Sequence, residues 1–332
     1  MAGRVLIFGS SGNSGRNLTR HFLELGWHVL GVSRSPHSHE DAKFTHISGD
    51  ITDASLYSKL PGAFDLVVNF AGIQPSILSY DENLEPRRAL QEYVSTNILG
   101  TSRVLDFVAA RGIPTYVYAT SHRDIENHWA QGRRLANNLP VSINPQGDHA
   151  LYAATKASGM MLGDCVGDSF GFRVFNLRLP MIFLVPQNPH YLKAGKQKLM
   201  PFLRLIRDAR QGKALEVWGD PGLKRDYVHV KNLLNMVKLC FDSPLDGGTF
   251  AVGTGEAVST ESFVRGIAQE FAPGDKEISL VYRMDLRTYK NAIYEVEEQA
   301  ELLGYSPVLL PEMLSLLHKE LRSSDSFTRW GW

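Results

Sequence analysis

The sequence has no net charge, only two cysteines and no long apolar run. Its 332 residues include 35 Lys and Arg against 35 Asp and Glu, which argues against a general nucleic-acid or membrane-surface binder. No apolar stretch approaches the roughly 20 residues that a membrane-spanning helix needs. Cys165 and Cys240 lie far apart in apolar helical patterns, which predicts buried thiols and no disulfide or metal site.

What the sequence does contain is ordinary for a soluble globular protein, with 43% hydrophobic residues. Its length allows one large domain or two smaller ones. The first apolar strand begins at Val5, which leaves no room for a signal peptide. We therefore expect a cytoplasmic protein that binds neither nucleic acid nor membrane.

The chain is organised around the stretch from Val5 to Arg16. Four apolar residues predict a buried strand, three glycines follow at Gly9, Gly12 and Gly15, and an amphipathic helix begins near Asn17. Such a turn lets backbone N–H groups approach phosphates at a helix N-terminus. The pattern predicts a dinucleotide site that includes Ser11, Asn13 and Ser14 as well as the glycines.

Strands and helices alternate up to residue 179, which predicts a doubly wound α/β sheet of the Rossmann type. Strands are expected at 28–32, 44–48, 64–70, 115–119 and 173–179, and helices at 87–110 and 152–169. Arg123 to His149 has no periodicity and is expected to be a long loop. We expect residues 1–179 to form the dinucleotide-binding domain. Residues 180–332 would form mainly a smaller mixed α/β substrate domain, with about 214–250 returning to the core.

The end of the second strand bears on the cofactor. An acidic residue there would bind the ribose hydroxyls of NAD, but the sequence reads Ser33-Arg34. A hydroxyl and a guanidinium suit a 2′-phosphate. We therefore expect NADP in preference to NAD.

Three residues carry the expected chemistry. Ser121 ends a strand on the side of the sheet where ligands bind, and Tyr152 and Lys156 share one face of a helix. Hydride transfer to a carbonyl requires a proton to move on or off the oxygen. We expect Lys156 to lower the pKa of Tyr152, so that Tyr152 serves as general acid/base while Ser121 holds the substrate oxygen.

These motifs resemble the extended short-chain dehydrogenase/reductase family, and in particular its branch acting on nucleotide-linked sugars. The resemblance implies catalytic roles for Thr120, Ser121, Tyr152 and Lys156. It implies cofactor contacts from the residues that match the family's binding segments, namely Asp50, Ile51, Phe70, Ala71, Gly72, Asn97 and Pro180. Asn97 also falls on the apolar face of its helix, where a buried amide is expected to bond a neighbouring backbone. A homodimer through the helices at 87–110 and 152–169 is implied as well.

The later motif from Leu215 to Asp220 and from Arg225 to Val230 resembles the family's substrate-domain signature, in which the arginine contacts the substrate diphosphate. Two departures matter. Ser121 is followed by His122-Arg123, where 4,6-dehydratases carry an acidic pair, so a dehydratase is disfavoured. Met181 stands where relatives have a diphosphate-binding Asn, which leaves a non-sugar carbonyl substrate open. His122 is expected either to bond the substrate or to shape the long loop.

The leading hypothesis is an NADP-dependent ketoreductase acting on a nucleotide-linked keto sugar. The alternative is a 4-epimerase with tightly bound NAD(P), which uses the same residues but returns the hydride to the opposite face. A non-catalytic dinucleotide-binding regulator is disfavoured because both Tyr152 and Lys156 are present.

Overall fold

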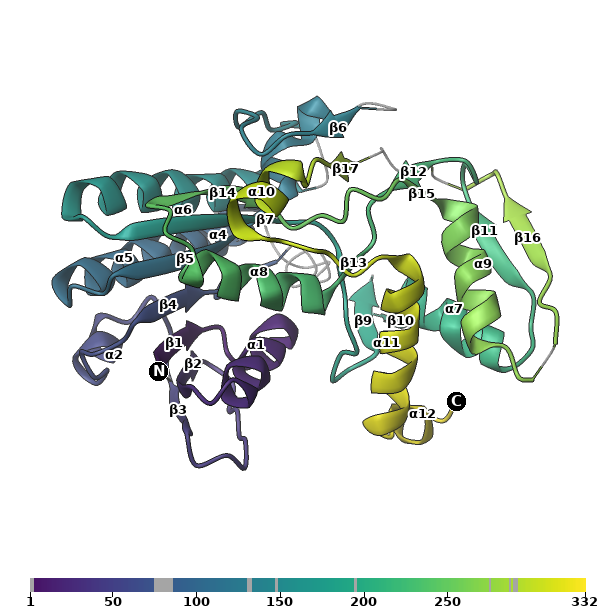
Figure 1. Cartoon of the computed structure of the whole chain (residues 1–332), viewed down its shortest axis with the longest axis horizontal. Coiled ribbons are helices and arrows are strands. Elements are labelled where there is room, and N and C mark those ends of the chain that lie inside the picture. The colour runs from purple at the N-terminus through teal and green to yellow at the C-terminus, as the bar shows by residue number, and fades with distance from the viewer. Residues whose placement is uncertain are drawn as a thin grey trace.

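The computed structural model describes residues 3–74, 86–129, 133–146, 149–193, 196–274, 276–286, 288 and 292–332. Its centre is a seven-stranded sheet in the order β14-β7-β5-β4-β1-β2-β3 (Figure 1). Every neighbouring pair in it is parallel. The strands are β1 (Arg4–Phe8), β2 (His28–Ser33), β3 (Phe44–Ser48), β4 (Leu66–Asn69), β5 (Thr115–Ser121), β7 (Arg173–Leu179) and β14 (Gly247–Ala251). The predicted doubly wound α/β fold is confirmed.

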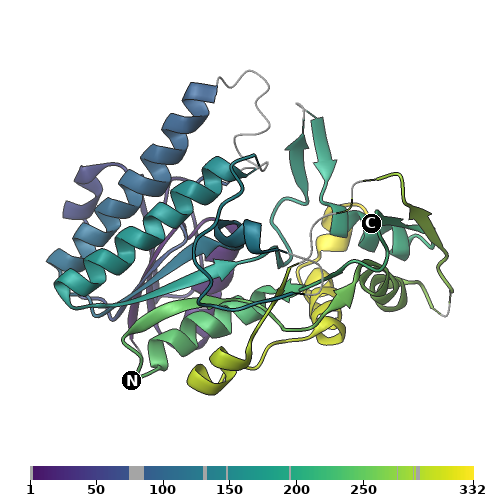
Figure 2. The ribbon, with the colours of Figure 1, turned by 90° about the horizontal axis from the view of Figure 1, so that it is seen from above.

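The sheet is buried on both faces, which explains the continuous apolar runs from Val5 to Phe8 in β1 and from Leu66 to Val68 in β4. In β1, Val5 and Ile7 join the core beneath α1 (Asn13–Glu24) and α8 (Val230–Asp242), whereas Leu6 and Phe8 join the opposite core. That second core lies under α5 (Thr101–Ala110) and α6 (Ala150–Phe170), with α2 (Ala54–Ser58) nearby. Figure 2 shows α5 and α6 running side by side over this face.

Two elements from the second half of the chain complete this core. β14 pairs with β7 over five residues, and α8 packs its Leu233, Met236 and Val237 into the same cluster as α1. The chain therefore crosses back into the sheet after residue 228.

A second cluster of buried side chains lies around Ile206, Val217, Phe263 and Leu317. It is enclosed by α7 (Pro201–Arg210), β11 (Leu215–Trp218), α9 (Thr260–Phe271), β16 (Leu280–Arg283), α11 (Leu310–Ser323) and α12 (Ser326–Arg329). Short two-stranded pairings link the remaining segments: β8 (Ile182–Phe183) with β13 (Val228–His229), β9 (His190–Lys193) with β10 (Lys196–Leu199), β12 (Lys224–Arg225) with β15 (Val258–Ser259), and β17 (Ile293–Tyr294) with β6 (Arg134–Leu135). Helix α10 is Glu297–Leu303.

Three local expectations differ from the structure. The helix predicted at 87–110 is divided into α4 (Pro86–Tyr93), the π-helical η1 (Val94–Gly100) and α5. The predicted loop at 123–149 contains the 3₁₀-helical η2 (His122–His128) and strand β6, which are too short to produce a periodic pattern. Cys165 is exposed because it lies on the outward face of α6, while Cys240 is buried as predicted. Within the ranges given above, no helix combines the length and apolar character that crossing a bilayer requires.

Candidate active site

The glycine turn after β1 is shaped by close backbone packing. Gly9 has φ +83°, and a Cβ there would lie 2.7 Å from the backbone of Phe70 and Ala71. A Cβ on Gly15 would lie 2.2 Å from the carbonyl oxygen of Gly9. Both positions therefore require glycine. The result is that α1 begins at Asn13, directly beneath the turn and beside the C-terminal end of β4.

A cavity of about 440 Å³ lies over this turn and the adjoining strand ends. Thirteen of the residues predicted to bind the cofactor line it: Gly9, Ser11, Gly12, Asn13, Ser14, Gly15, Ser33, Arg34, Asp50, Ile51, Phe70, Ala71 and Gly72. The structure adds Val32, Ser35, Gly49, Gln74 and Thr96, which the sequence analysis missed. Val32, Ser35 and Gly49 could have been found by extending each predicted segment by one residue. Thr96 could not, because it lies in the π-helical η1.

The start of α1 fits an anionic group. Its N-cap is Gly12, no side chain caps it, and its first turn contains no acidic residue. The N–H groups of the first turn have no partner within a helix, and the helix dipole is positive at this end. A diphosphate satisfies both requirements, so the residues present fit a dinucleotide.

The end of β2 faces the same cavity. The Ser33 hydroxyl donates to the Ser35 carbonyl oxygen at 2.9 Å and contacts Ser10 Oγ at 3.3 Å and His46 Nε2 at 2.9 Å. These contacts use its one hydrogen and both lone pairs. Arg34 is more than half exposed and lies 4.0 Å from the carboxylate of Asp50. Of the two, Arg34 is therefore the side chain that remains available to an incoming phosphate.

Asn97 holds the loop after β4 in place. Its Oδ1 accepts from the Ile73 N–H at 2.8 Å, and its Nδ2 donates to the Ile73 carbonyl at 3.3 Å and to Thr155 Oγ1 at 3.1 Å. The expectation that Asn97 bonds a neighbouring backbone is confirmed. The same contacts tie η1 and α6 to the edge of the cavity at Gly72, where an added Cβ would lie 3.1 Å from Asn97 Oδ1.

The three predicted catalytic residues meet beside this cavity. Ser121 ends β5, and its side chain lies close enough to Tyr152, in the first turns of α6, to favour the charged form of Tyr152. Lys156 lies one turn further along α6, with its Nζ 4.0 Å from the ring centroid of Tyr118 and an exposed fraction of only 4%. Tyr93 of α4 approaches Tyr152 with ring centroids 6.4 Å apart. A proton donor or acceptor, its orienting hydroxyl and a buried amine are thus in one place.

The predicted lowering of the Tyr152 pKa by Lys156 is wrong for this structure. Burial raises the pKa of Tyr152 to about 12, outweighing the hydrogen bond from Ser121, which lowers it. Burial also lowers the pKa of Lys156 to about 7. Both shifts have the same physical cause, because a charge on either group loses its hydration. The pair therefore favours a neutral phenol over a phenolate at neutral pH.

Thr120 and His122 flank Ser121 on either side. Thr120 is buried, and its Oγ1 has no hydrogen-bond partner among the described residues. His122 contacts the hydroxyl of Tyr294 through Nδ1 and lies 4.7 Å from the ring of Trp129. Burial lowers the pKa of His122 to about 3, so the ring is neutral. These contacts connect the end of β5 to η2 and β17.

The remaining predicted residues, Pro180, Met181 and Arg225, lie outside the lining of the cavity at the glycine turn. Pro180 follows β7, and Met181 is 64% exposed. Arg225 lies on β12 with its guanidinium carbon 5.9 Å from the Tyr227 ring centroid. Neither Met181 nor Arg225 lines the cavity at the glycine turn. The structure therefore does not join these three residues to that cavity.

Asp226, next to Arg225, was not singled out in the sequence. Its carboxylate accepts from the backbone N–H groups of Thr254 at 2.8 Å, of Gly255 at 3.2 Å and of Tyr294 at 3.2 Å. It thereby fixes the turn that follows β14. The motif Arg225 to Val230 contained this residue, but its partners lie in segments that no local pattern connects.

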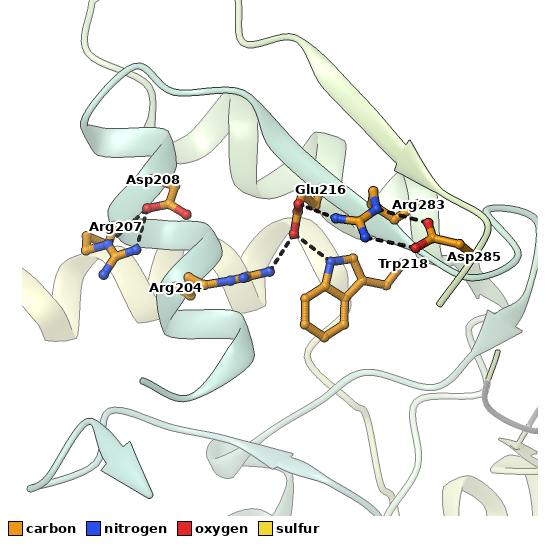
Figure 3. Close-up of polar contacts among 7 residues, drawn as sticks. All are labelled: Arg204, Arg207, Asp208, Glu216, Trp218, Arg283 and Asp285. Atoms are coloured by element: carbon orange, nitrogen blue, oxygen red, sulfur yellow. Dashed lines mark hydrogen bonds and ion pairs between the residues drawn. The ribbon is translucent and has the colours of Figure 1, made fainter. Parts of the chain in front are cut away.

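A charged cluster on α7, β11 and β16 was also missed (Figure 3). Glu216 accepts from Arg204 at 3.0 Å, from the Trp218 indole at 2.8 Å and from Arg283 at 3.1 Å. The Arg204 guanidinium lies 4.6 Å from the Trp218 ring centroid, and Trp218 remains 40% exposed. Arg283 is also held by Asp285. The cluster therefore places the Trp218 ring at the surface, with the Arg204 guanidinium next to it.

Comparison with known proteins agrees with this geometry. Residues 5–253 match the model of the NAD dependent epimerase/dehydratase family. An uncharacterized UDP-glucose epimerase of Bacillus subtilis is 25% identical over 77% of this chain and 78% of its own length. A UDP-glucose 4-epimerase of Mycolicibacterium smegmatis is 23% identical over 92% and 93%.

Solved structures share the fold over almost the whole chain. A UDP-glucose 4-epimerase from Thermotoga maritima, with UDP-glucose, superposes with a TM-score of 0.76 at 18% identity, covering 97% of this chain and 99% of the other. A Thermus thermophilus UDP-glucose 4-epimerase in complex with NAD gives 0.73 at 20% identity, covering 96% and 99%. With the glycine turn, the parallel sheet and the Ser121, Tyr152 and Lys156 arrangement, these findings establish that the chain belongs to the NAD dependent epimerase/dehydratase family, within the extended short-chain dehydrogenases/reductases.

Proposed function

We propose that this enzyme interconverts nucleotide-linked sugars by hydride transfer, as a 4-epimerase that keeps its dinucleotide bound. The observation that carries the proposal is the placement of Ser121 at the end of β5, with Tyr152 and Lys156 one turn apart on α6, beside the cavity at the glycine turn. Relatives named as UDP-glucose epimerases support the epimerase over the reductase expected from the sequence. Other relatives of similar identity are named as dTDP-glucose 4,6-dehydratases.

Proton transfer in this proposal belongs to Tyr152. With a pKa of about 12, its hydroxyl is protonated at neutral pH. When a hydride leaves the sugar carbon, the sugar hydroxyl proton passes to Tyr152 as the Tyr152 proton passes to the neutral form of Lys156, and both transfers reverse when the hydride returns. Ser121 lies beside the Tyr152 hydroxyl and favours its charged form. The dinucleotide, when bound, supplies a carbon that accepts and returns a hydride. Lys156, whose pKa is about 7, takes up or releases a proton near neutral pH at little cost.

A dehydratase remains disfavoured in this proposal. Elimination needs a free acid and base beside the catalytic hydroxyl, and the first carboxylates after Ser121 are both engaged. Asp124 is buried and paired with Arg178 at 3.0 Å, and Glu126 is paired with Arg123 at 3.0 Å. Neither carboxylate is available to move a substrate proton.

A ketoreductase using NADP is the second candidate, and one observation favours it. Arg34 faces the cofactor cavity at the end of β2, where the sequence has no acidic residue, and the Asp50 carboxylate that lines the same cavity lies 4.0 Å from Arg34. The Ser33 hydroxyl already has its internal partners, so Arg34 would carry the 2′-phosphate interaction. Loss of that charge in Arg34→Ala is expected to weaken NADP binding by about tenfold and to leave NAD binding nearly unchanged.

We also propose a homodimer through α4, η1, α5 and α6. Their outer faces expose apolar side chains at Leu90, Val94, Leu99, Met161 and Phe170. Exposed apolar groups clustered on neighbouring helices are typical of protein interfaces. Light scattering of the wild type against Met161→Lys would test this, since a buried lysine should shift the dimer toward monomer.

The activity is tested by incubating purified protein with UDP-glucose and following UDP-galactose by chromatography. The proposal predicts conversion without added cofactor and a dinucleotide that survives desalting. If instead the protein loses its dinucleotide and consumes NADPH with a keto sugar nucleotide, the ketoreductase is correct. Turnover of a carbonyl compound that carries no nucleotide, with no activity on any sugar nucleotide, would reject both.

A further inference from the structure

A second cavity, of about 350 Å³, lies between α1, the segment after β8 and the corner of α11 and α12. We refer to it as the α1–α11 cavity and define it by Arg16, Arg20, Asn17, Gln187, Glu320 and Arg329. Figure 1 shows α1 facing α11 and α12 across this position. Only Asn13 lines both this cavity and the one at the glycine turn, so the two are adjacent but distinct.

Three guanidinium groups line the α1–α11 cavity against one carboxylate. Arg16 donates to the carbonyl oxygens of Ser11 at 3.0 Å and Pro36 at 3.3 Å, and Arg329 donates to Ser326 Oγ at 3.1 Å. Neither has a carboxylate within 4.0 Å among the residues that the structure describes. Arg20 bonds Asn17 Oδ1 at 2.8 Å and reaches Glu24 only at 4.0 Å. Glu320 and Glu24 offset part of this charge, and the cavity keeps an excess of positive charge around Arg16 and Arg329.

The carboxylate, Glu320, also lies close to a buried histidine that does not itself line the cavity. His229 is 1% exposed, and its Nδ1 accepts from the Lys231 N–H, so its hydrogen is on Nε2. That Nε2 has no hydrogen-bond partner among the described residues and lies 3.6 Å from Glu320 Oε1, too far for a hydrogen bond. A buried donor without an acceptor is rare in proteins. The Glu320 carboxylate thus lies close to the His229 ring without a hydrogen bond to it.

The combination of groups selects a ligand class. Arginines bind phosphate oxygens, often with two parallel hydrogen bonds. A carboxylate beside them repels a bare anion but accepts from hydroxyl groups, and the amides of Asn17 and Gln187 suit hydroxyls as well. The volume exceeds the need of a phosphate ion alone and lies in the range of small-molecule sites. We propose that the α1–α11 cavity binds a small phosphorylated, hydroxyl-rich metabolite of the sugar phosphate class.

The test uses calorimetric titration of the whole protein with glucose 6-phosphate, inorganic phosphate and glucose, in the presence of excess NAD. The proposal predicts saturable binding of glucose 6-phosphate, weaker binding of inorganic phosphate, none of glucose and no competition from NAD. Arg329→Ala should weaken glucose 6-phosphate binding about tenfold or more. Arg322→Ala is the matched control, since Arg322 is an exposed arginine at the same end of α11 that does not line the cavity.

Several results would overturn the proposal. These are no saturable binding at millimolar glucose 6-phosphate, displacement by NAD, equal affinity for inorganic phosphate, or equal loss in Arg329→Ala and Arg322→Ala. Arg20→Ala serves as a second variant on a different helix and is expected to weaken binding in the same way. Circular dichroism of each variant separates a lost contact from a lost fold.

Discussion

The burial of Lys156 leads to a prediction about stability. Its pKa is lowered by burial from 10.5 to about 7. Between these values the unfolded chain holds a proton on this lysine that the folded chain has released, so the free energy of unfolding rises with pH across this window. Below about pH 7 the folded protein also holds the charge and pays its full cost of dehydration. Lys156→Met removes the charge while keeping an unbranched apolar side chain of similar length.

The size of the effect follows from the shift. The two pKa values differ by about 3.5, and each pKa unit corresponds to about 1.36 kcal/mol. The charge on Lys156 therefore lowers the free energy of unfolding by at most about 5 kcal/mol. The Lys156 amine lies 4.0 Å from the Tyr118 ring centroid, and attraction of the cation to that ring reduces the effect below this upper limit. We expect Lys156→Met to exceed the wild type in free energy of unfolding by about 2 to 5 kcal/mol near pH 6. The difference should fall toward zero near pH 10.

The assay is equilibrium urea unfolding of the dinucleotide-free protein at a series of pH values. Other groups titrate in both proteins alike, so the difference between the two curves isolates Lys156. Lys231→Met is the control for loss of a surface lysine, because Lys231 is half exposed and pairs with Glu312, and it should not reproduce the gain in free energy of unfolding near pH 6. If the wild type and Lys156→Met curves run parallel, Lys156 keeps its charge in the fold and the reasoning is refuted.

Three further predictions concern other parts of the molecule. Asp124→Asn leaves the buried Arg178 guanidinium without its counter-charge and should lower the free energy of unfolding by about 3 kcal/mol or more, as measured in urea; a change under about 1 kcal/mol would contradict the buried pair. Cys165 lies one turn along α6 from Met161, so in the Met161→Lys monomer it should react with a thiol reagent, whereas Cys240, buried and with a pKa raised to about 12, should react only after unfolding, as mass spectrometry of labelled peptides would show; labelling of both at one rate would contradict the burial. Arg34→Ala should lower the ratio of NADP to NAD affinity in fluorescence titrations, and an unchanged ratio would remove Arg34 from the cofactor site.

The parts of the fold that could be predicted are those with a local cause. The apolar run at Val5 and the glycine spacing at Gly9, Gly12 and Gly15 depend only on neighbouring residues, and the structure has β1 and α1 there. Asn97 was also predictable, because a buried amide on an apolar helix face must find partners. The π-helical turn that places it was not, since one extra residue in a turn leaves the apolar period almost unchanged.

The rest depends on contacts between distant segments. The pKa of Tyr152 is set by how deeply α6 packs against β5, and the residue spacing from Tyr152 to Lys156 contains no information about burial. The α1–α11 cavity combines Arg16 with Arg329, more than three hundred positions apart in the chain. The partners of Asp226 lie in segments 28 and 68 residues away. Sites of this kind can be identified only once the folded structure is known.

The central claim is that Tyr152 moves the proton while a bound dinucleotide exchanges the hydride with a nucleotide sugar. The most direct measurement compares wild type and Tyr152→Phe, both loaded with NAD, after mixing with UDP-glucose, by following the absorbance of reduced nicotinamide and the formation of UDP-galactose. The account predicts both signals in the wild type and a fall of about 10²-fold or more in Tyr152→Phe, with NAD affinity retained. Equal rates in the two proteins would contradict it.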